Sequence, residues 1–500
     1  MVNFKNRDVI SITDFSPEEI LDLCGLGKVM YDLEKSGRRY NSEYKFTVKR
    51  KLASFFCESS TRTRLGTNAA MYELNGVFDG FSGAEGTSLT KNETIRDTIM
   101  MANALHYDAI IMRHSKDGAL QWAADVSQTP VINGGDGINE HPTQALLDML
   151  TLYMYNNNKF DGLTIGFGGD LSHGRTIRSL SLALSHFDDI TIRWAAEDFL
   201  GMPKDLSDLL QSRSVKVERL ETVREVMSGV KFYYMTRPQT ERMKDVSQEQ
   251  VIEMMKKYRV DLSQVDGFDV RLMHPLPVNS KIAEIDYRVY FSPVQSFFKQ
   301  AEFGLLLRKA LLYEILKHDG YIQFSGKLDP KLEFGNNKLK REIKTRIKEG
   351  MFIDNILYGT CLDHLPSASA QGIADGWNLK DRGYFFVPAN IPKTNKSFLK
   401  TDLIDPTERE LKSAAIKAPD PTVNYIKDGK VISKFVYLLC KNDNCITRAV
   451  NEDVPPKFYN DDGTIRCRYC RRPYTLKNQK VSETELKSFV QSLPKSVNPL

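Results

Sequence analysis

The chain has 500 residues, of which 41% are hydrophobic and 27% are charged, and its net charge is +5. These values are typical of a globular protein with about three domains and exclude a disordered chain. The small positive charge suits an anionic ligand but does not by itself indicate nucleic-acid binding. No apolar run approaches the ~20 residues of a membrane helix, and the first residues lack the apolar core of a signal peptide. We therefore expect a cytoplasmic protein without a membrane partner.

Residues 1 to about 320 alternate helical and strand-like patterns, which predicts α/β architecture with parallel sheets. Ser16-Pro17-Glu18-Glu19 has the N-cap, the proline and the acidic first turn of a helix start. Three apolar strands, at 109–112, 163–167 and 231–235, each precede polar residues that include an arginine. Open α/β sheets bind ligands at the carboxyl ends of their strands, so these polar residues are expected near a site.

Residues 56–64 read Phe-Cys-Glu-Ser-Ser-Thr-Arg-Thr-Arg, just before an apolar periodic run. A helix that starts at Ser60 would direct backbone N–H groups, three hydroxyls and the Arg62 guanidinium at one point. A helix amino terminus carries partial positive charge and unpaired donors, so this arrangement would bind a phosphate or phosphonate. The alternative interpretation is an ordinary N-capped helix with solvated arginines.

Three further segments carry groups that suit a small anionic substrate. His141 and Gln144 are three residues apart at a helix start, so an imidazole and an amide can reach the same carbonyl compound. Ser88 and Lys91 follow a glycine-rich stretch, which is consistent with a mobile loop. The prolines in His274-Pro275-Leu276-Pro277 restrict a turn that could offer a carbonyl to an amine. Each segment alone could be merely structural.

The segment 319–349 is polar and carries basic residues from Lys338 to Lys348, which predicts a linker or a solvated helix. Nucleic-acid contact is the alternative interpretation of such a basic run. A second folded unit is expected over 350–435. Within it, Asp405-Pro406-Thr407-Glu408 predicts a capping-box helix start with the proline at the first helical position.

The last unit, 436–486, contains two close pairs of cysteines. Cys440 and Cys445 are spaced C-x4-C, Cys467 and Cys470 are spaced C-x2-C, and 21 residues separate the pairs. In a reducing compartment such pairs favour a metal over disulfides, and four thiolates form the closed tetrahedral site of a structural Zn²⁺. The alternative is four unrelated thiols. Basic and aromatic residues around the second pair leave a nucleic-acid-binding ribbon open as a second function class.

Together the motifs of residues 1 to about 315 resemble the aspartate and ornithine carbamoyltransferase family. The matching segments, in the family's order, are Ser60-Thr61-Arg62-Thr63, Met112-Arg113-His114, His141-Pro142-Thr143-Gln144, Asp170 with Gly174-Arg175-Thr176, Thr236-Arg237-Pro238-Gln239 and His274-Pro275-Leu276-Pro277. The resemblance implies two parallel-sheet α/β lobes. Residues 1–142, completed by a helix near 297–318, would bind carbamoyl phosphate, and 143–296 would bind aspartate.

The resemblance also implies roles for individual residues. Those that would hold carbamoyl phosphate are Ser60, Thr61, Arg62, Thr63, Arg113, His141, Gln144 and Leu276, with Ser88 and Lys91 reaching across from a neighbouring subunit of a trimer. Among these, Thr63, Arg113 and His141 would polarise the carbamoyl oxygen. Arg62 would stabilise the departing phosphate, and Gln144 and the Leu276 carbonyl would hold the carbamoyl nitrogen. The groups that would bind aspartate are Arg175, Arg237, Gln239, Lys91 and Leu276.

The acceptor is expected to be aspartate. Ornithine enzymes typically carry a cysteine where this chain has Pro275, and their acidic motif is absent. The two guanidiniums of Arg175 and Arg237 match the planar geometry of a dicarboxylate. A carbamoyltransferase for another amino acid, or an inactive transferase serving as a zinc-ribbon scaffold, are the alternatives. The family also commonly has an arginine where Val278 stands and a longer loop before Glu93.

Residues 350 to about 480 resemble the regulatory chain of aspartate carbamoyltransferase, through Gly359-Thr360, Asp363-His364, residues 421–424 and the cysteine pattern. The chain is thus expected to be a fused catalytic and regulatory polypeptide, with an α+β regulatory lobe and a C-terminal zinc ribbon that binds protein and not nucleic acid. Structural Zn²⁺ is the expected metal, with no catalytic cofactor. A site for ATP or CTP would include Asp363, His364, Lys396, Lys400, Asn424, Ile426 and Lys434. A regulatory fold without nucleotide is the alternative.

Overall fold

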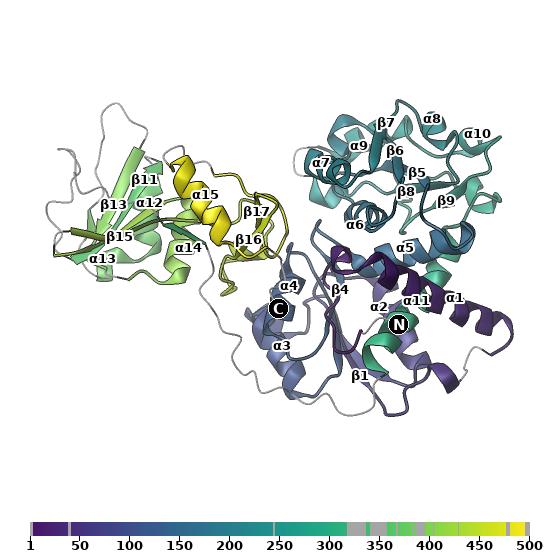
Figure 1. The fold of residues 1–500 in the computed structure, drawn as a ribbon, viewed down its shortest axis with the longest axis horizontal. Helices are drawn as coiled ribbons and strands as arrows, with labels where there is room; N and C mark the ends of the chain where they lie inside the picture. Colours follow the sequence, from purple (N-terminus) through teal and green to yellow (C-terminus); the bar gives the residue numbers. More distant parts are fainter. Residues whose placement is uncertain are drawn as a thin grey trace. The chain divides into compact units, whose positions relative to one another are not determined.

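The computed structural model describes residues 4–38, 42–243, 246–317, 337–340, 358–366, 369–382, 385–386, 396–403, 405–428, 430–476 and 481–495. The chain divides into two compact units, Met1–Lys327 and Leu328–Leu500 (Figure 1). The expected linker 319–349 lies outside the described residues, except for 337–340.

The first lobe of the first unit is built on a parallel four-stranded sheet with the spatial order β2-β1-β3-β4. Its strands are β1 (Lys51–Phe56), β2 (Val77–Ser82), β3 (Ala109–His114) and β4 (Val131–Asp136), and its helices are α2 (Thr61–Glu73), α3 (Ile95–Ala104) and α4 (Ala119–Val126). Every residue of β4 is buried, as expected for a parallel strand covered on both faces.

The second lobe contains a parallel five-stranded sheet with the order β7-β6-β5-β8-β9. Its strands are β5 (Thr164–Gly169), β6 (Thr191–Ala195), β7 (Lys216–Arg219), β8 (Phe232–Thr236) and β9 (Arg271–Met273). The helices are α6 (Arg175–Leu184), α7 (Lys204–Ser212), α8 (Val223–Met227), α9 (Gln248–Lys256) and α10 (Leu262–Val265). The two parallel-sheet lobes confirm the α/β class that the sequence predicts.

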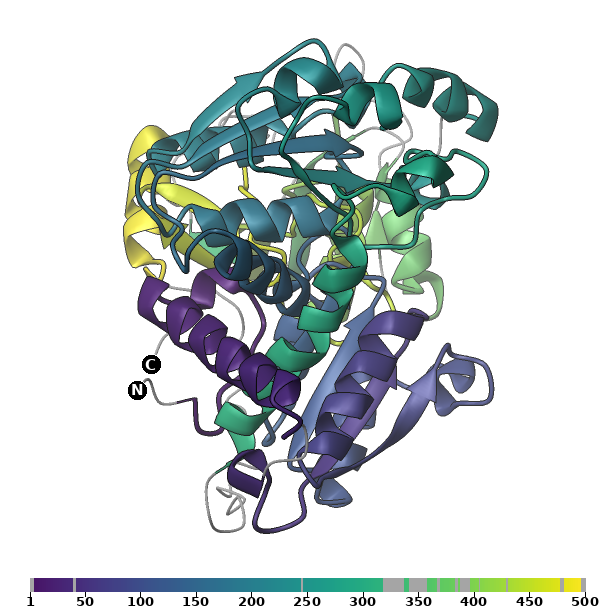
Figure 2. The ribbon, with the colours of Figure 1, turned by 90° about the vertical axis from the view of Figure 1, so that its right-hand side faces the viewer.

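Three further helices pack against one another, and two of them, α5 (Pro142–Tyr155) and α11 (Phe297–Leu316), contact both lobes. α5 follows the first sheet, and α11 returns to pack against α1 (Pro17–Lys35), α2 and α5. Figure 2 shows α1 and α11 side by side. The first eleven residues of α5 are all buried, so this helix forms part of the core. α1 begins as the sequence predicts, with a capping box between Ser16 and Glu19.

The second unit contains a six-stranded antiparallel sheet with the order β10-β15-β14-β11-β13-β12. The strands are β10 (Lys338–Lys340), β11 (Tyr358–Pro366), β12 (Phe385–Phe386), β13 (Lys396–Thr401), β14 (Thr422–Lys427) and β15 (Lys430–Tyr437). α12 (Ser369–Gly376), α13 (Leu379–Arg382) and α14 (Glu408–Lys417) complete the lobe, and its core includes Trp377, Leu362 and Leu411. This confirms the α+β lobe.

Two local features of this unit differ from the sequence prediction. Lys338–Lys340 pair with β15 as an edge strand and do not belong to a solvated connection. α14 begins two positions later than predicted, at Glu408, because the Thr407 hydroxyl accepts from the Glu410 N–H and the Glu410 carboxylate accepts from the Thr407 N–H. Thr407 is therefore the N-cap, and Pro406 precedes the helix.

The chain ends with the hairpin of β16 (Phe458–Asp461) and β17 (Thr464–Cys467), followed by α15 (Glu483–Ser492). α15 contacts both β10 and β16, so it joins the ribbon to the preceding sheet within the same unit. Within the described ranges, no helix combines the length and the apolar content that crossing a membrane requires.

Candidate active site

The first part of the candidate site lies where β1 ends and α2 begins. Ser60 is the N-cap of α2, and its hydroxyl makes no capping hydrogen bond. Thr61 and Arg62 are exposed, whereas Thr63 is buried with 5% of its surface accessible. The start of α2 therefore presents a hydroxyl and a guanidinium beside the backbone donors of a helix amino terminus, as the sequence predicts.

A carboxylate that the sequence analysis missed lies among the cations of the site. One oxygen of Glu58 accepts from Arg113 at 2.6 Å and from Arg175 at 3.0 Å. Arg113 comes from the end of β3, and Arg175 starts α6 in the second lobe, so Glu58 links the two lobes. Glu58 lies only two positions before Ser60, and an acidic residue so close to this motif is the sequence signal from which its role could have been predicted.

The predicted imidazole is buried between the lobes. His141 is the N-cap of α5, its Nε2 lies 3.4 Å from the Thr63 hydroxyl, and its backbone N–H donates to Ser179 of α6 at 2.9 Å. Burial, together with the positive charges of Arg175 and Arg113, lowers the pKa of His141 well below its ordinary value. The imidazole is therefore neutral at physiological pH.

The groups predicted to hold a carbamoyl nitrogen are connected through buried polar residues. Gln144 donates from Nε2 to Asp148 at 2.9 Å. The Leu276 N–H donates to His274 Nδ1 at 2.8 Å, and Leu276 has a positive φ of 56° in this turn. The structure thus contains the turn that the two prolines predict, and Gln144 lies on the first turn of α5 as expected.

The predicted acceptor-binding residues lie at the carboxyl ends of β5 and β8. Gln239 donates from its backbone N–H to Asp170 at 3.0 Å and from Nε2 to the His173 carbonyl at 2.6 Å. Arg237 is paired with Glu241 at 3.0 Å. Partial loss of solvent around the guanidinium and the nearby charge of Arg237 lower the pKa of Arg62, so guanidiniums from the two lobes act on each other.

Ser88 and Lys91 stand apart from the other predicted site residues. Both are exposed and lie on the short 3-10 helix η3 (Ser88–Lys91). In the described part of the chain, no hydrogen bond or ion pair joins them to the residues above. Val278, where the family commonly has arginine, packs partly buried against the core.

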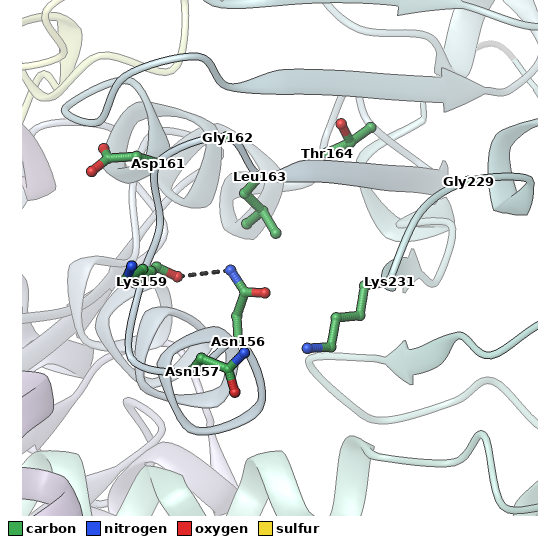
Figure 3. Close-up of a pocket in the computed structure, with 9 residues that line it drawn as sticks. All are labelled: Asn156, Asn157, Lys159, Asp161, Gly162, Leu163, Thr164, Gly229 and Lys231. Carbon is green, nitrogen blue, oxygen red and sulfur yellow. Dashed lines mark hydrogen bonds between the residues drawn. The ribbon is translucent and has the colours of Figure 1, made fainter.

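A pocket with a volume of about 430 Å³ lies at the amino ends of strands in the second sheet, at the end opposite to the predicted site residues (Figure 3). Its lining comes from residues at and just before the amino ends of β5 and β8, whereas the predicted site residues follow these strands. The lining residues are Asn156, Asn157, Lys159, Asp161, Gly162, Leu163, Thr164, Gly229 and Lys231. This pocket is therefore separate from the candidate active site.

The four predicted metal ligands converge in the ribbon. The Sγ atoms of Cys440 and Cys470 are 3.5 Å apart, those of Cys445 and Cys467 are 3.8 Å apart, and all four lie within 4.8 Å of one another. A tetrahedral Zn²⁺ with Zn–S bonds of about 2.3 Å requires sulfur separations of roughly 3.8 Å. All four thiols are buried, so the site suits a structural Zn²⁺ with no open coordination position.

Four adjacent strands bring the predicted nucleotide-site residues onto one face of the second unit's sheet. Cys361 of β11 pairs with Lys400 and with Asn424, and Asn424 pairs with Lys434. Residues two positions along a strand share a face, which adds Asp363 and Ile426. Ile426 is fully buried, and the Asn424 side chain donates to the Cys361 carbonyl. The side chains of His364 and Lys396 lie outside the described part of the chain.

Four protein-family models match the chain. The aspartate/ornithine carbamoyltransferase carbamoyl-phosphate-binding domain matches residues 7–154, and the Asp/Orn-binding domain matches 161–315. The allosteric domain of the aspartate carbamoyltransferase regulatory chain matches 351–437, and its metal-binding domain matches 430–480.

Curated relatives are similar in sequence to the first unit. The aspartate carbamoyltransferase catalytic subunit of Pyrobaculum neutrophilum is 38% identical over 314 residues, which are 63% of this chain and 99% of the relative. That of Methanocaldococcus jannaschii is 34% identical over 311 residues, 62% of this chain and 98% of the relative.

Solved structures agree with these relatives. The catalytic subunit of M. jannaschii aspartate transcarbamoylase has a TM-score of 0.57 and 34% identity, over 62% of this chain and 98% of that one. The Trypanosoma cruzi enzyme in complex with N-(phosphonacetyl)-L-aspartic acid has a TM-score of 0.56 and 32% identity, over 63% and 96% of the two chains. The chain therefore belongs to the aspartate/ornithine carbamoyltransferase family, with both domains of an aspartate carbamoyltransferase regulatory chain fused behind its catalytic part.

Proposed function

We propose that the chain transfers the carbamoyl group of carbamoyl phosphate to L-aspartate, which gives N-carbamoyl-L-aspartate and phosphate for pyrimidine biosynthesis. The observation that carries this proposal is the meeting of cations from both lobes, Arg113 and Arg175, around one carboxylate beside the neutral His141. A doubly anionic donor and a dicarboxylate acceptor need such a set of guanidiniums. The names of the curated relatives support the same activity.

The reaction needs positioning and charge stabilisation more than a covalent intermediate. The aspartate amine attacks the carbamoyl carbon, a new N–C bond forms, and the C–O bond to phosphate breaks. The amine proton leaves with the phosphate. Thr63 and the neutral His141 lie side by side, so both can donate to the carbamoyl oxygen as negative charge develops there. Arg62 at the start of α2 stabilises the departing phosphate.

The acceptor is aspartate because its two carboxylates match the guanidiniums of Arg175 and Arg237. Purified protein incubated with carbamoyl phosphate is expected to carbamoylate aspartate and not ornithine, with the ureido product measured colorimetrically. Turnover of ornithine in place of aspartate would contradict the acceptor assignment, and no turnover of either would contradict the transferase.

The active unit is a trimer in which Ser88 and Lys91 complete a neighbour's site. Two observations support this proposal. Both residues are exposed and detached from their own chain's site. Large apolar side chains are also exposed on the neighbouring elements α2, β2 and α3, namely Leu65, Tyr72, Val77, Phe78, Met100 and Met101. Such clustering of exposed apolar residues is typical of a subunit interface.

The regulatory lobe binds ATP or CTP through the face that carries Lys400, Asn424 and Lys434. Lysines suit the phosphates, and an amide suits the edge of a base. Calorimetric titration of the full chain with each nucleotide tests this, with Lys434→Met as the variant that should weaken binding. Equal binding by the variant would contradict the assignment of this face.

A further inference from the structure

We propose that Asp148 is a positioning residue that holds the Gln144 amide with its oxygen, not its nitrogen, toward the nitrogen of the carbamoyl donor. This inference rests on the proposed function and deepens it, because it assigns the origin of the preference for a carbamoyl over an acyl donor. Asp148 itself does not contact the substrate in this proposal.

Asp148 lies one turn after Gln144 on α5 and is completely buried. Its Oδ1 accepts from Gln144 Nε2 at 2.9 Å and from Gln300 Nε2 at 2.6 Å. Its Oδ2 accepts from the Tyr234 hydroxyl at 2.8 Å. A buried carboxyl with three donors directed at it is held as an acceptor. Burial raises the pKa of Asp148 to about 7, while these three donors and the positive charge of Arg308 act in favour of the ionised form. A proton on Oδ2, beside the Tyr234 hydroxyl, would leave Oδ1 as the acceptor for both glutamines.

The chemistry of this acceptor decides which end of each amide faces it. An amide has a donor end and an acceptor end, and a carboxylate can pair only with the donor end. Gln144 therefore directs Nε2 at Asp148 and leaves Oε1 for the substrate. The Tyr234 hydroxyl can donate or accept, so it cannot select one amide end by itself.

The Asp148 carboxylate also positions the second group proposed to hold the carbamoyl nitrogen, the Leu276 carbonyl. Because Gln300 donates Nε2 to Asp148, its Oε1 accepts from the His274 N–H at 2.9 Å. His274 Nδ1 in turn accepts from the Leu276 N–H at 2.8 Å, which holds the turn that carries the Leu276 carbonyl. One buried carboxylate thus fixes two acceptors that come from distant segments, the start of α5 and the turn after β9, and both favour an NH2 group over a methyl group.

The proposal is tested with two stable donor analogues that differ only in this group. Phosphonoacetamide carries the NH2, and 2-oxopropylphosphonate carries a methyl group in its place. Calorimetric titration of the wild-type chain should show about tenfold or more tighter binding of the amide, as expected for an NH2 group that donates to two acceptors. In Asp148→Leu, which keeps the branched arrangement of side-chain heavy atoms but removes the acceptor, the ratio of the two dissociation constants should fall to about one.

Asp148→Asn is the matched control. Its Oδ1 can still accept from both glutamines while its amide donates to the Tyr234 hydroxyl, so the preference should be kept. A folded Asp148→Leu protein that keeps the tenfold ratio would overturn the proposal. So would loss of the ratio in Asp148→Asn.

Should Asp148→Leu not fold, Gln300→Met provides a second test. It removes only the bridge to the His274 turn, and the ratio should fall severalfold. An unchanged ratio in this variant would overturn the inference. Failure of the proposed function is distinguishable, because a wild-type chain that prefers the amide but does not carbamoylate aspartate contradicts that function alone.

Discussion

Glu58 places a carboxylate where the candidate site must bind anions. It pairs with Arg113 and with Arg175, one from each lobe, and therefore holds both guanidiniums in place before substrate arrives. A hydrogen bond between two charged groups contributes about 1.5–3 kcal/mol, more than a neutral one. The charge of Glu58, and not only its shape, is what aligns the two arginines.

Glu58→Gln should accordingly lower kcat for aspartate carbamoylation by about tenfold or more, because each arginine loses a charge-assisted hydrogen bond. Steady-state kinetics at saturating carbamoyl phosphate measure this loss, and thermal unfolding serves as the control for folding. An unchanged kcat in a folded variant would show that Glu58 does not align the arginines.

A second prediction for a single residue concerns His141 and the pH dependence of the free energy of unfolding. Its pKa is lowered in the folded chain, so below pH ~6.5 the unfolded chain binds a proton that the folded chain does not. The contribution of His141 to the free energy of unfolding is therefore lost as the pH falls below that value. Urea unfolding at pH 7.5 and 5.5 should show a larger loss for the wild type than for His141→Gln. Equal losses would contradict a neutral, buried imidazole.

At the scale of elements, local patterns predicted most of what lies at strand and helix ends. The capping box of α1, the strand that carries Arg113 at its carboxyl end and the helix start after Ser60 all have short-range signals, and the structure contains each of them. The link between Gln144, Asp148 and Gln300 has no such signal, because Gln300 lies 152 residues from Asp148 along the chain. Contacts of this kind depend on how α11 returns to α5, which no local pattern encodes.

The ribbon gives a prediction at the same scale. β16 and β17 form an isolated two-stranded hairpin, which is marginally stable without further support. Modification of the four thiols should release about one zinc per chain and unfold the hairpin, because metal binding supplies much of the folding free energy in so small a unit. A chromogenic zinc indicator and circular dichroism measure the two effects. A folded ribbon that contains no zinc before modification would rule out the metal.

At the scale of the whole molecule, the proposed trimer requires that a second copy supplies the exposed Lys91 to the candidate site. The chain's own lobes contain the guanidiniums, the imidazole and the two proposed acceptors for the carbamoyl nitrogen, but η3 directs no interaction at them in the ranges that the structure describes. A closed trimer places the same exposed face of each protomer against the next one. If one variant lacks the His141 part of the site and another lacks the Lys91 part, mixing the two variants should therefore restore some activity.

His141→Ala and Lys91→Ala should each be nearly inactive as pure proteins. After subunit exchange at equal concentrations, about a quarter of the sites in random trimers combine an intact His141 with an intact Lys91 from a neighbour. Activity should rise toward that fraction, whereas each variant exchanged with itself should stay inactive. Exchange itself is followed by native mass spectrometry of differently tagged chains. Demonstrated exchange without any recovered activity would mean that each chain builds its site alone.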